Sequence, residues 1–246
     1  MNVFYTHPDL VSRETLIIEQ PELHHLTHVL RMGPGAEIEV TDGMGGYYFV
    51  TLELVEGKGA RCRIRESKPG FHEPAVHMAL AFPLMKQSSK FDLVVEKATE
   101  LGVREIIPIV TERTIPRSGK LERWRQIALS ATKQCRRAYC PVIAPVLQWR
   151  ELMERFSDYS HRLVLYERQT AREPIPDPFA NAFAPGNTVL FVVGPEGSFT
   201  EREIVEAENA GCVLVWLGPR RLRSETAALS AMSLASYFTR GEECRI

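Results

Sequence analysis

The stretch of sequence that decides the fold is TVLFVVGPEGSFT, residues 188–200. Residues 188–193 form an apolar run of strand length, and Gly194, Pro195 and Gly197 then fix a tight turn. Thr200 and Glu203 have the spacing of a capping box, which places the start of a helix at Thr200. A strand that passes through a glycine-rich turn into a helix is typical of a parallel α/β sheet.

The alternation of strands and helices continues on both sides of this stretch. We therefore expect an α/β domain with a mostly parallel sheet. The predicted strands span 76–82, 105–110, 162–166, 188–193 and 212–217, and the predicted helices span 88–101, 121–137, a segment starting near 200, and 225–240.

The N-terminal part of the chain has a different pattern. Short β-type runs at 37–41, 47–55 and 60–66 are separated by glycine-rich turns, and leucines at helical spacing predict one helix over 21–31. The composition then breaks at 68–74. We therefore expect a small β-barrel domain over 1–70 and the α/β domain over 74–246.

The composition excludes several classes of protein. The chain has 246 residues, 44% hydrophobic and 25% charged, with a net charge of -1, which argues against a protein that coats nucleic acid non-specifically. The apolar runs are too short to span a bilayer, and the first residues do not resemble a secretory signal. The five widely spread cysteines favour reduced thiols over disulfides or a structural metal. We expect a cytoplasmic protein without membrane contact.

Two loops follow the last two predicted strands, where open α/β sheets bind their ligands. The first, residues 194–200, exposes backbone amides with little side-chain obstruction. It has neither the phosphate-loop spacing nor a complete GxGxxG, so a nucleoside triphosphate or dinucleotide is disfavoured. A plain turn between strand and helix explains this loop equally well.

The second loop, residues 217–227, carries three arginines within four positions, at Arg220, Arg221 and Arg223. They precede a nearly apolar helix, where their charge opposes the positive end of the helix dipole. Contact with an anionic ligand or with RNA explains that cost. A solvated turn is the alternative.

Several separate motifs follow one another along nearly the whole chain. They are His24-His25-Leu26, Val29-Leu30-Arg31, Asp42-Gly43, residues 97–103, Thr111-Glu112-Arg113, Arg123-Trp124, Gln134, Arg137, Pro141, residues 194–197, Leu217-Gly218, Leu222-Arg223 and Glu225-Thr226-Ala227. In these residues the chain resembles the small-subunit ribosomal RNA uridine-N3 methyltransferase E family of the SPOUT superfamily. Ser198, Arg221 and Ser224 depart from the usual residues of that family.

The resemblance implies a trefoil-knotted C-terminal SPOUT domain, a PUA-like or OB-like N-terminal barrel that helps to hold RNA, and a homodimer. It implies S-adenosylmethionine, bound in a bent form, as methyl donor, and N3 of a specific uridine in 16S ribosomal RNA as acceptor. The expected partners are ribosomal RNA or the small ribosomal subunit, and DNA is not expected. Two alternatives stay open: a catalytically silent RNA-binding or assembly factor, and a SPOUT methyltransferase that acts on another RNA.

The resemblance also assigns site residues. Arg223 is the candidate cation for the charge that develops on the base, and Glu225 is a candidate general base, although Glu225 also suits the first turn of a helix. The candidate cofactor contacts are Leu165, Tyr166, Gly194, Pro195, Glu196, Gly197, Leu217, Gly218, Leu222, Arg223, Thr226 and Ala227.

The candidate RNA contacts are mostly arginines, whose guanidinium groups suit phosphates and bases. They are His24, His25, Arg31, Arg113, Arg117, Arg123, Arg136 and Arg137. No acidic or thiol partner accompanies the histidines, so no metal is expected there, and local packing is the alternative role. The last predicted helix is apolar over most of its circumference, which indicates a core helix, a dimer interface or both.

Overall fold

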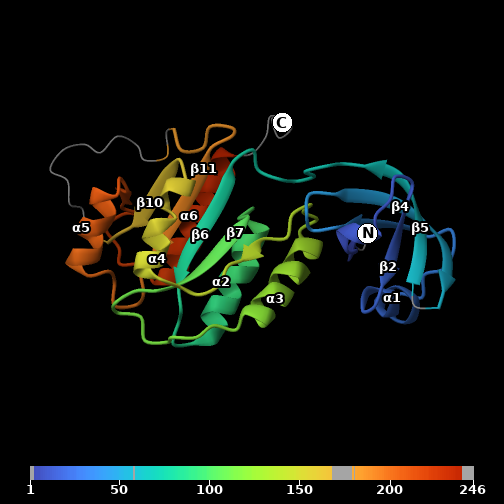
Figure 1. Ribbon diagram of the computed structural model, residues 1–246, viewed down its shortest axis with the longest axis horizontal. Coiled ribbons are helices and arrows are strands. Elements are labelled where there is room, and N and C mark those ends of the chain that lie inside the picture. The colour runs from blue at the N-terminus through green and yellow to red at the C-terminus, as the bar shows by residue number, and fades with distance from the viewer. Residues whose placement is uncertain (1–2, 58, 168–178, 180, 240–246) are drawn as a thin grey trace. The chain divides into compact units, whose positions relative to one another are not determined.

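The computed structural model describes residues 3–57, 59–167, 179 and 181–239 (Figure 1). The chain divides into two compact units. The N-terminal unit comprises Met1–Glu73 together with Leu129–Cys140, and the C-terminal unit comprises Pro74–Ala128 together with Pro141–Ile246. The segment 129–140 was not part of the N-terminal domain expected from the sequence.

The N-terminal unit contains a five-stranded sheet. The three strands predicted from the sequence are present, and two further strands form its edges. Thr6 Oγ1, just after one edge strand, donates a hydrogen bond of 2.5 Å to the carbonyl oxygen of Ile17 in the other, so the sheet curls toward closure as a half-barrel. The strand order is β1 (Val3–Tyr5), β3 (Glu37–Thr41), β4 (Tyr47–Glu56), β5 (Gly59–Ser67) and β2 (Thr15–Glu19).

Alternation along these strands builds the core of the half-barrel. In β5, Ala60 and Cys62 are buried, whereas Arg61 and Arg63 are exposed. Burial raises the pKa of the Cys62 thiol to about 12, so this cysteine is a protonated, apolar core group.

The helix expected over 21–31 is shorter and less regular than predicted. A single turn of α-helix, α1 (Glu22–His24), runs into a π-helix, η2 (His25–Val29). Leu30 N–H donates to the carbonyl of His25, five residues back, at 3.0 Å. The π-helix corrects the prediction of a single α-helix. The sequence could not show the difference, because an apolar repeat does not distinguish the two helix types over so short a length.

Residues that follow helix α3 (Leu121–Gln134) complete the N-terminal unit through two ion pairs. Arg137 is 2% exposed, and its Nε and Nη2 lie 3.1 and 2.7 Å from the Glu73 carboxylate oxygens. Arg136 pairs in the same bidentate manner with Glu39, which is 1% exposed. The prediction that Arg137 contacts RNA is corrected here, because its charge is buried against Glu73.

The C-terminal unit contains a parallel sheet, as the sequence predicts (Figure 1). Its helices include α2 (Ser88–Glu100), α5 (Glu201–Asn209) and α6 (Ser224–Phe238), and the predicted residue 240 lies outside the described residues. The strand order is β12 (Val213–Val215), β10 (His161–Leu165), β11 (Thr188–Val193), β6 (His77–Pro83), β7 (Glu105–Val110) and β8 (Val142–Ile143), with β9 (Leu147–Gln148) also paired to β7.

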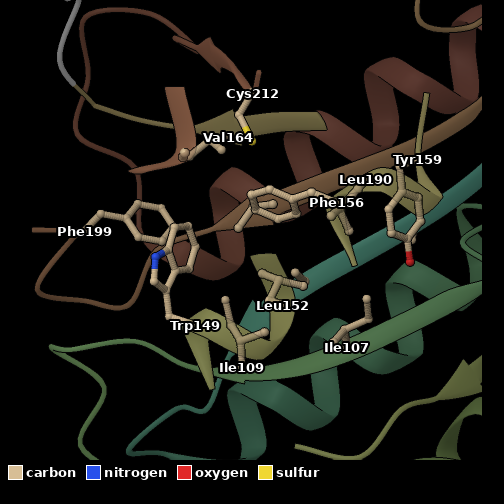
Figure 2. Close-up of a cluster of buried hydrophobic side chains, with 14 of the residues drawn as sticks. Ile107, Ile109, Trp149, Leu152, Phe156, Tyr159, Val164, Leu190, Phe199 and Cys212 are labelled. Carbon is tan, nitrogen blue, oxygen red and sulfur yellow. The ribbon is translucent and has the colours of Figure 1, made fainter. Parts of the chain in front are cut away.

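One face of this sheet packs against helix α4 (Trp149–Glu154) and the 3-10 helix η3 (Phe156–Asp158), which the sequence did not predict. Figure 2 shows Trp149 beside Phe199, the aromatic residue of the 194–200 loop, and the two ring centroids are 5.5 Å apart. Trp149 Nε1 also donates to Glu206 of α5 at 2.9 Å. The glycine-rich loop is therefore anchored in the apolar core.

The capping box at the start of α5 is confirmed. Thr200 accepts a hydrogen bond from Glu203 N–H, and Glu203 Oε2 accepts one from Thr200 N–H at 2.9 Å. Glu203 is 1% exposed, and its other oxygen accepts from Glu112 N–H at 2.9 Å. The buried carboxylate of Glu203 therefore connects the segment after β7 to the start of α5.

We expect Glu203→Ala to lower the free energy of unfolding by about 3 kcal/mol, because the N–H groups of Thr200 and Glu112 lose a buried, charged acceptor. Denaturant titration measures this. Glu208→Ala is the matched control, since Glu208 is an exposed residue of the same helix. An equal, small effect of both substitutions would contradict the role given to Glu203.

No helix within the described part of the chain has both the length and the apolar character needed to cross a membrane.

Candidate active site

A cavity of about 230 Å³ lies where β10, β11 and β12 end. Both loops singled out in the sequence contribute to it, together with the residues that follow β10. Its walls are apolar at the strand ends, and arginines stand at its edge. The lining residues are Leu165, Tyr166, Glu167, Val193, Gly194, Pro195, Glu196, Ser198, Val215, Trp216, Leu217, Gly218, Arg220, Arg221, Leu222, Arg223, Ser224 and Ala227.

Glycines allow the backbone conformation of the two loops. A Cβ on Gly194 would lie 3.0 Å from the Phe199 ring, so a larger residue would displace this ring or the loop. Gly218 has a φ of +107°, a conformation that residues with a side chain rarely adopt. The loops are joined by Ser224 Oγ, which donates to the Gly194 carbonyl oxygen at 2.7 Å. They therefore form one connected wall.

Arg113 holds the first loop, residues 194–200, through hydrogen bonds to the backbone of the loop. Its Nη1 donates to the carbonyl oxygens of Gly197 and Phe199 at 2.7 and 3.3 Å. A Cβ on Gly197 would lie 3.3 Å from the Cβ of Arg113, so glycine permits this close approach. The sequence suggested RNA contact for Arg113, and the structure shows that at least part of its guanidinium group holds the loop.

The cavity contains most of the predicted cofactor residues. Gly197 and Thr226 are not among the lining residues: Gly197 packs against Arg113, and Thr226 is exposed on α6. The lining also includes Ser198, Arg220, Arg221 and Ser224, which lie in the two loops singled out from the sequence but were not named as cofactor contacts. Glu167, Val193, Val215 and Trp216 complete the lining at or just after the ends of β10, β11 and β12, and this position at strand ends is the signal that could have identified them.

The two candidate catalytic residues lie at the start of α6. Arg223 is the N-cap, is exposed and lines the cavity. Glu225 is outside the cavity lining, and its Oε1 lies 3.2 Å from Lys90 Nζ of α2. Lys90 was not identified from the sequence, because a lysine on a helix carries no motif.

The other candidate RNA residues lie in both units. In the C-terminal unit, Arg117 is exposed, and Arg123 pairs with Asp92 at 2.9 Å while its side chain remains 60% exposed. In the N-terminal unit, His24, His25 and Arg31 are exposed. No group of three or more His, Cys, Asp or Glu side chains in the described ranges is arranged to hold a metal ion.

Comparison with known families identifies both units. Residues 72–236 match the model described as an RNA methyltransferase domain, and residues 18–65 match the model described as an RNA methyltransferase PUA domain. Ribosomal RNA small subunit methyltransferase E of Bacillus subtilis is 30% identical over 242 residues, which cover 95% of this chain and 94% of that protein. Its counterpart from Mesomycoplasma hyopneumoniae is 36% identical over 186 residues, which cover 74% of this chain and 78% of that protein.

Solved structures show the same similarity. Ribosomal RNA small subunit methyltransferase E from Neisseria gonorrhoeae, bound to S-adenosyl methionine, superposes with a TM-score of 0.80 at 30% identity, covering 96% of this chain and 97% of that chain. A putative methyltransferase from Legionella pneumophila, in complex with the same cofactor, gives a TM-score of 0.74 at 25% identity, covering 96% of both chains. The chain therefore belongs to the ribosomal RNA small subunit methyltransferase E family, as a methyltransferase domain joined to a PUA domain.

Proposed function

We propose that this protein transfers a methyl group from S-adenosylmethionine to N3 of a specific uridine in 16S ribosomal RNA. The observation that carries the proposal is the cavity at the ends of β10, β11 and β12, which is lined by residues of the two loops 194–200 and 217–227. Relatives with the same fold are bound to this cofactor. The substrate is ribosomal RNA or the small ribosomal subunit.

The cavity suits S-adenosylmethionine in a bent form. The cavity of about 230 Å³ is bounded by the ends of three neighbouring strands, so a bent conformer brings both parts of the cofactor to the same group of residues. Leu165, Val193 and Leu217 supply apolar surface for the adenine ring, and the glycine-rich loops bring backbone groups close to the ligand. Glu167 and Arg221, 2.9 Å apart at the edge, offer charges of both signs to the methionine part.

The chemistry assigns roles to residues at the start of α6. Bound S-adenosylmethionine supplies a methyl group that is already activated on a sulfonium. The protein must therefore orient the uridine and remove the proton of N3. Arg223, exposed beside the cavity, stabilises negative charge on the carbonyl oxygens of the base. Glu225 lies outside the cavity lining and pairs with Lys90, which favours its alternative role as a negative residue in the first turn of α6.

RNA contact is proposed for exposed groups of both units. In the PUA domain these are His24, His25 and Arg31, and in the methyltransferase domain they are Arg117 and Arg123. Such groups position the RNA backbone, whereas the cavity selects the base.

The active form is proposed to be a homodimer with a trefoil knot. Leu234, Tyr237 and Phe238 of α6 are 42, 57 and 52% exposed, which supports burial against a second copy. After the edge strand β12, the chain returns to β11 in the interior of the sheet, where Ser224 bonds to Gly194. This return path supports the knot. Analytical ultracentrifugation tests the dimer, and a complete backbone trace tests the knot.

The deciding experiment is mass spectrometry of 16S ribosomal RNA from cells without this protein. We expect 3-methyluridine to be absent and to return on complementation. Unchanged 3-methyluridine would reject the specific assignment, and loss of a different methylated nucleoside would identify another RNA site. A calorimetric titration in which S-adenosylmethionine does not bind would favour the catalytically silent factor.

A further inference from the structure

Trp216 is the largest apolar side chain of the cavity lining, and it remains open to solvent. It follows β12 directly and is 41% exposed. The residue before it, Val215, also lines the cavity and is 2% exposed. The buried apolar floor of the cavity therefore ends at Val215, and Trp216 lies at the mouth.

The other two tryptophans of the chain are core residues with satisfied indole groups. Trp124 is 3% exposed, and its Nε1 donates to Asp92 at 3.1 Å. Trp149 is 8% exposed, and its Nε1 donates to Glu206 at 2.9 Å. Within the part of the chain that the structure describes, Trp216 has neither a hydrogen bond to its indole nor a ring contact. A large, rigid aromatic group in that state is typical of a surface that contacts a ligand.

The charges beside Trp216 are mainly positive. Three arginines and two glutamates line the same cavity. Arg221 is paired with Glu167 at 2.9 Å, whereas Arg220 and Arg223 are exposed and form no ion pair with a described residue. An open aromatic ring beside unpaired guanidinium groups is the arrangement that binds unpaired RNA, because bases stack on the ring and phosphates contact the cations.

The depth of the lining residues separates the cofactor from the RNA. Leu165, Val193 and Val215 are 7, 2 and 2% exposed, so they surround the inner part of the cavity. The proposed cofactor occupies that inner part, and the RNA must approach from the solvent side. Trp216 is on that side, so its indole is available to a base while the cofactor is bound.

We propose that Trp216 is an RNA-binding residue, whose indole stacks on an unpaired base of the substrate at the mouth of the cofactor cavity while Arg220 contacts an adjoining phosphate. The inference rests on the proposed function, because it concerns how RNA meets the same cavity. It requires the RNA to present an unstacked base there, since a base within a duplex has no free face for an indole.

Tryptophan fluorescence of the full-length protein tests the contact directly. Acrylamide, a neutral quencher, reaches Trp216 but is excluded from the buried Trp124 and Trp149. We expect single-stranded oligouridylate, added to protein saturated with S-adenosylmethionine, to protect the quenchable fraction of the fluorescence. An abasic oligonucleotide of the same length carries the phosphates without the bases and should give no protection.

Substitutions separate the base contact from the phosphate contact. We expect Trp216→Leu to raise the Kd for oligouridylate about tenfold, while the Kd for the abasic oligonucleotide and for S-adenosylmethionine change less than about threefold. Trp216→Phe keeps a ring and should restore most of the affinity. Arg220→Ala should weaken both oligonucleotides alike and reduce the salt dependence of binding. Val213→Ala is the control, because Val213 is 40% exposed on the same strand and lies outside the cavity lining; it should change neither affinity.

Three results would overturn the inference. Full protection of Trp216 by S-adenosylmethionine alone would assign the indole to the cofactor. Protection that rises with protein concentration and not with RNA would assign it to a second copy of the chain. An equal loss of affinity for both oligonucleotides in Trp216→Leu would exclude base stacking. If the base contact is found but cells without the protein keep their 3-methyluridine, the proposed function fails and the contact stands; loss of 3-methyluridine without protection of Trp216 rejects this inference alone.

Discussion

Arg223→Ala is expected to lose most methylation while it retains S-adenosylmethionine binding. The Arg223 side chain is exposed at the edge of the cavity, and its backbone forms the N-cap of α6 without a side-chain cap bond. Its guanidinium group is therefore available to the RNA base. Loss of one preorganised donor to a developing negative charge lowers kcat by about 100- to 1,000-fold. Single-turnover assays measure the rate, and calorimetry measures cofactor affinity.

Arg150→Ala is the control for this substitution, because Arg150 is an exposed arginine of the same domain on α4, outside the cavity lining. It should leave the rate unchanged. An equal loss of cofactor affinity and rate in Arg223→Ala would show that Arg223 binds the cofactor. A higher KM for RNA with unchanged kcat would make Arg223 a phosphate contact.

Gly194→Val is expected to weaken S-adenosylmethionine binding about tenfold or more, because overpacking at a well-packed site costs roughly 1–3 kcal/mol. The added Cβ would lie 3.0 Å from the ring of Phe199, which is 3% exposed and packs against Trp149. The ring cannot move without disturbing the core, so the loop must shift into the cavity. Calorimetric titration measures the affinity.

Gly33→Val is the matched control, because a Cβ at Gly33 meets nothing within 4 Å. It should leave the affinity for the cofactor unchanged. If Gly194→Val binds S-adenosylmethionine as tightly as the wild-type protein, the first loop does not form the cofactor wall.

The sequence predicted the C-terminal architecture well because the relevant signals are local. Apolar runs gave β7 and β11 their observed bounds, and the capping box at Thr200 marked the start of α5. The same reasoning identified both cavity loops, since a strand end is recognisable from its own residues. The same reasoning named Gly197 and Thr226 as cofactor contacts, but neither is among the residues that line the cavity. Gly197 packs against Arg113 and Thr226 is exposed, and the sequence does not show in which direction a residue faces.

Features that depend on contacts distant in sequence were missed. The edge strand β1 is three residues long, too short for a periodic pattern. Arg137 looked like a surface RNA contact because its partner, Glu73, is far away in the chain. Lys90 and Glu225 meet only through the packing of α2 on α6. Periodicity and motifs describe neighbours in sequence, so they cannot reveal such pairs.

The insertion of residues 129–140 into the N-terminal unit makes the order of synthesis important. Glu39 and Glu73 are buried and receive their cations from Arg136 and Arg137. A nascent chain that has reached only the end of the half-barrel therefore holds two carboxylates without their partners, and burying them is unfavourable. The N-terminal unit is complete only after residues 74–128 of the methyltransferase domain and the segment 129–140 have been synthesised. Its completion is thereby coupled to synthesis of the catalytic domain, and we expect a fragment that ends at residue 73 to be less stable than the same unit within the whole chain.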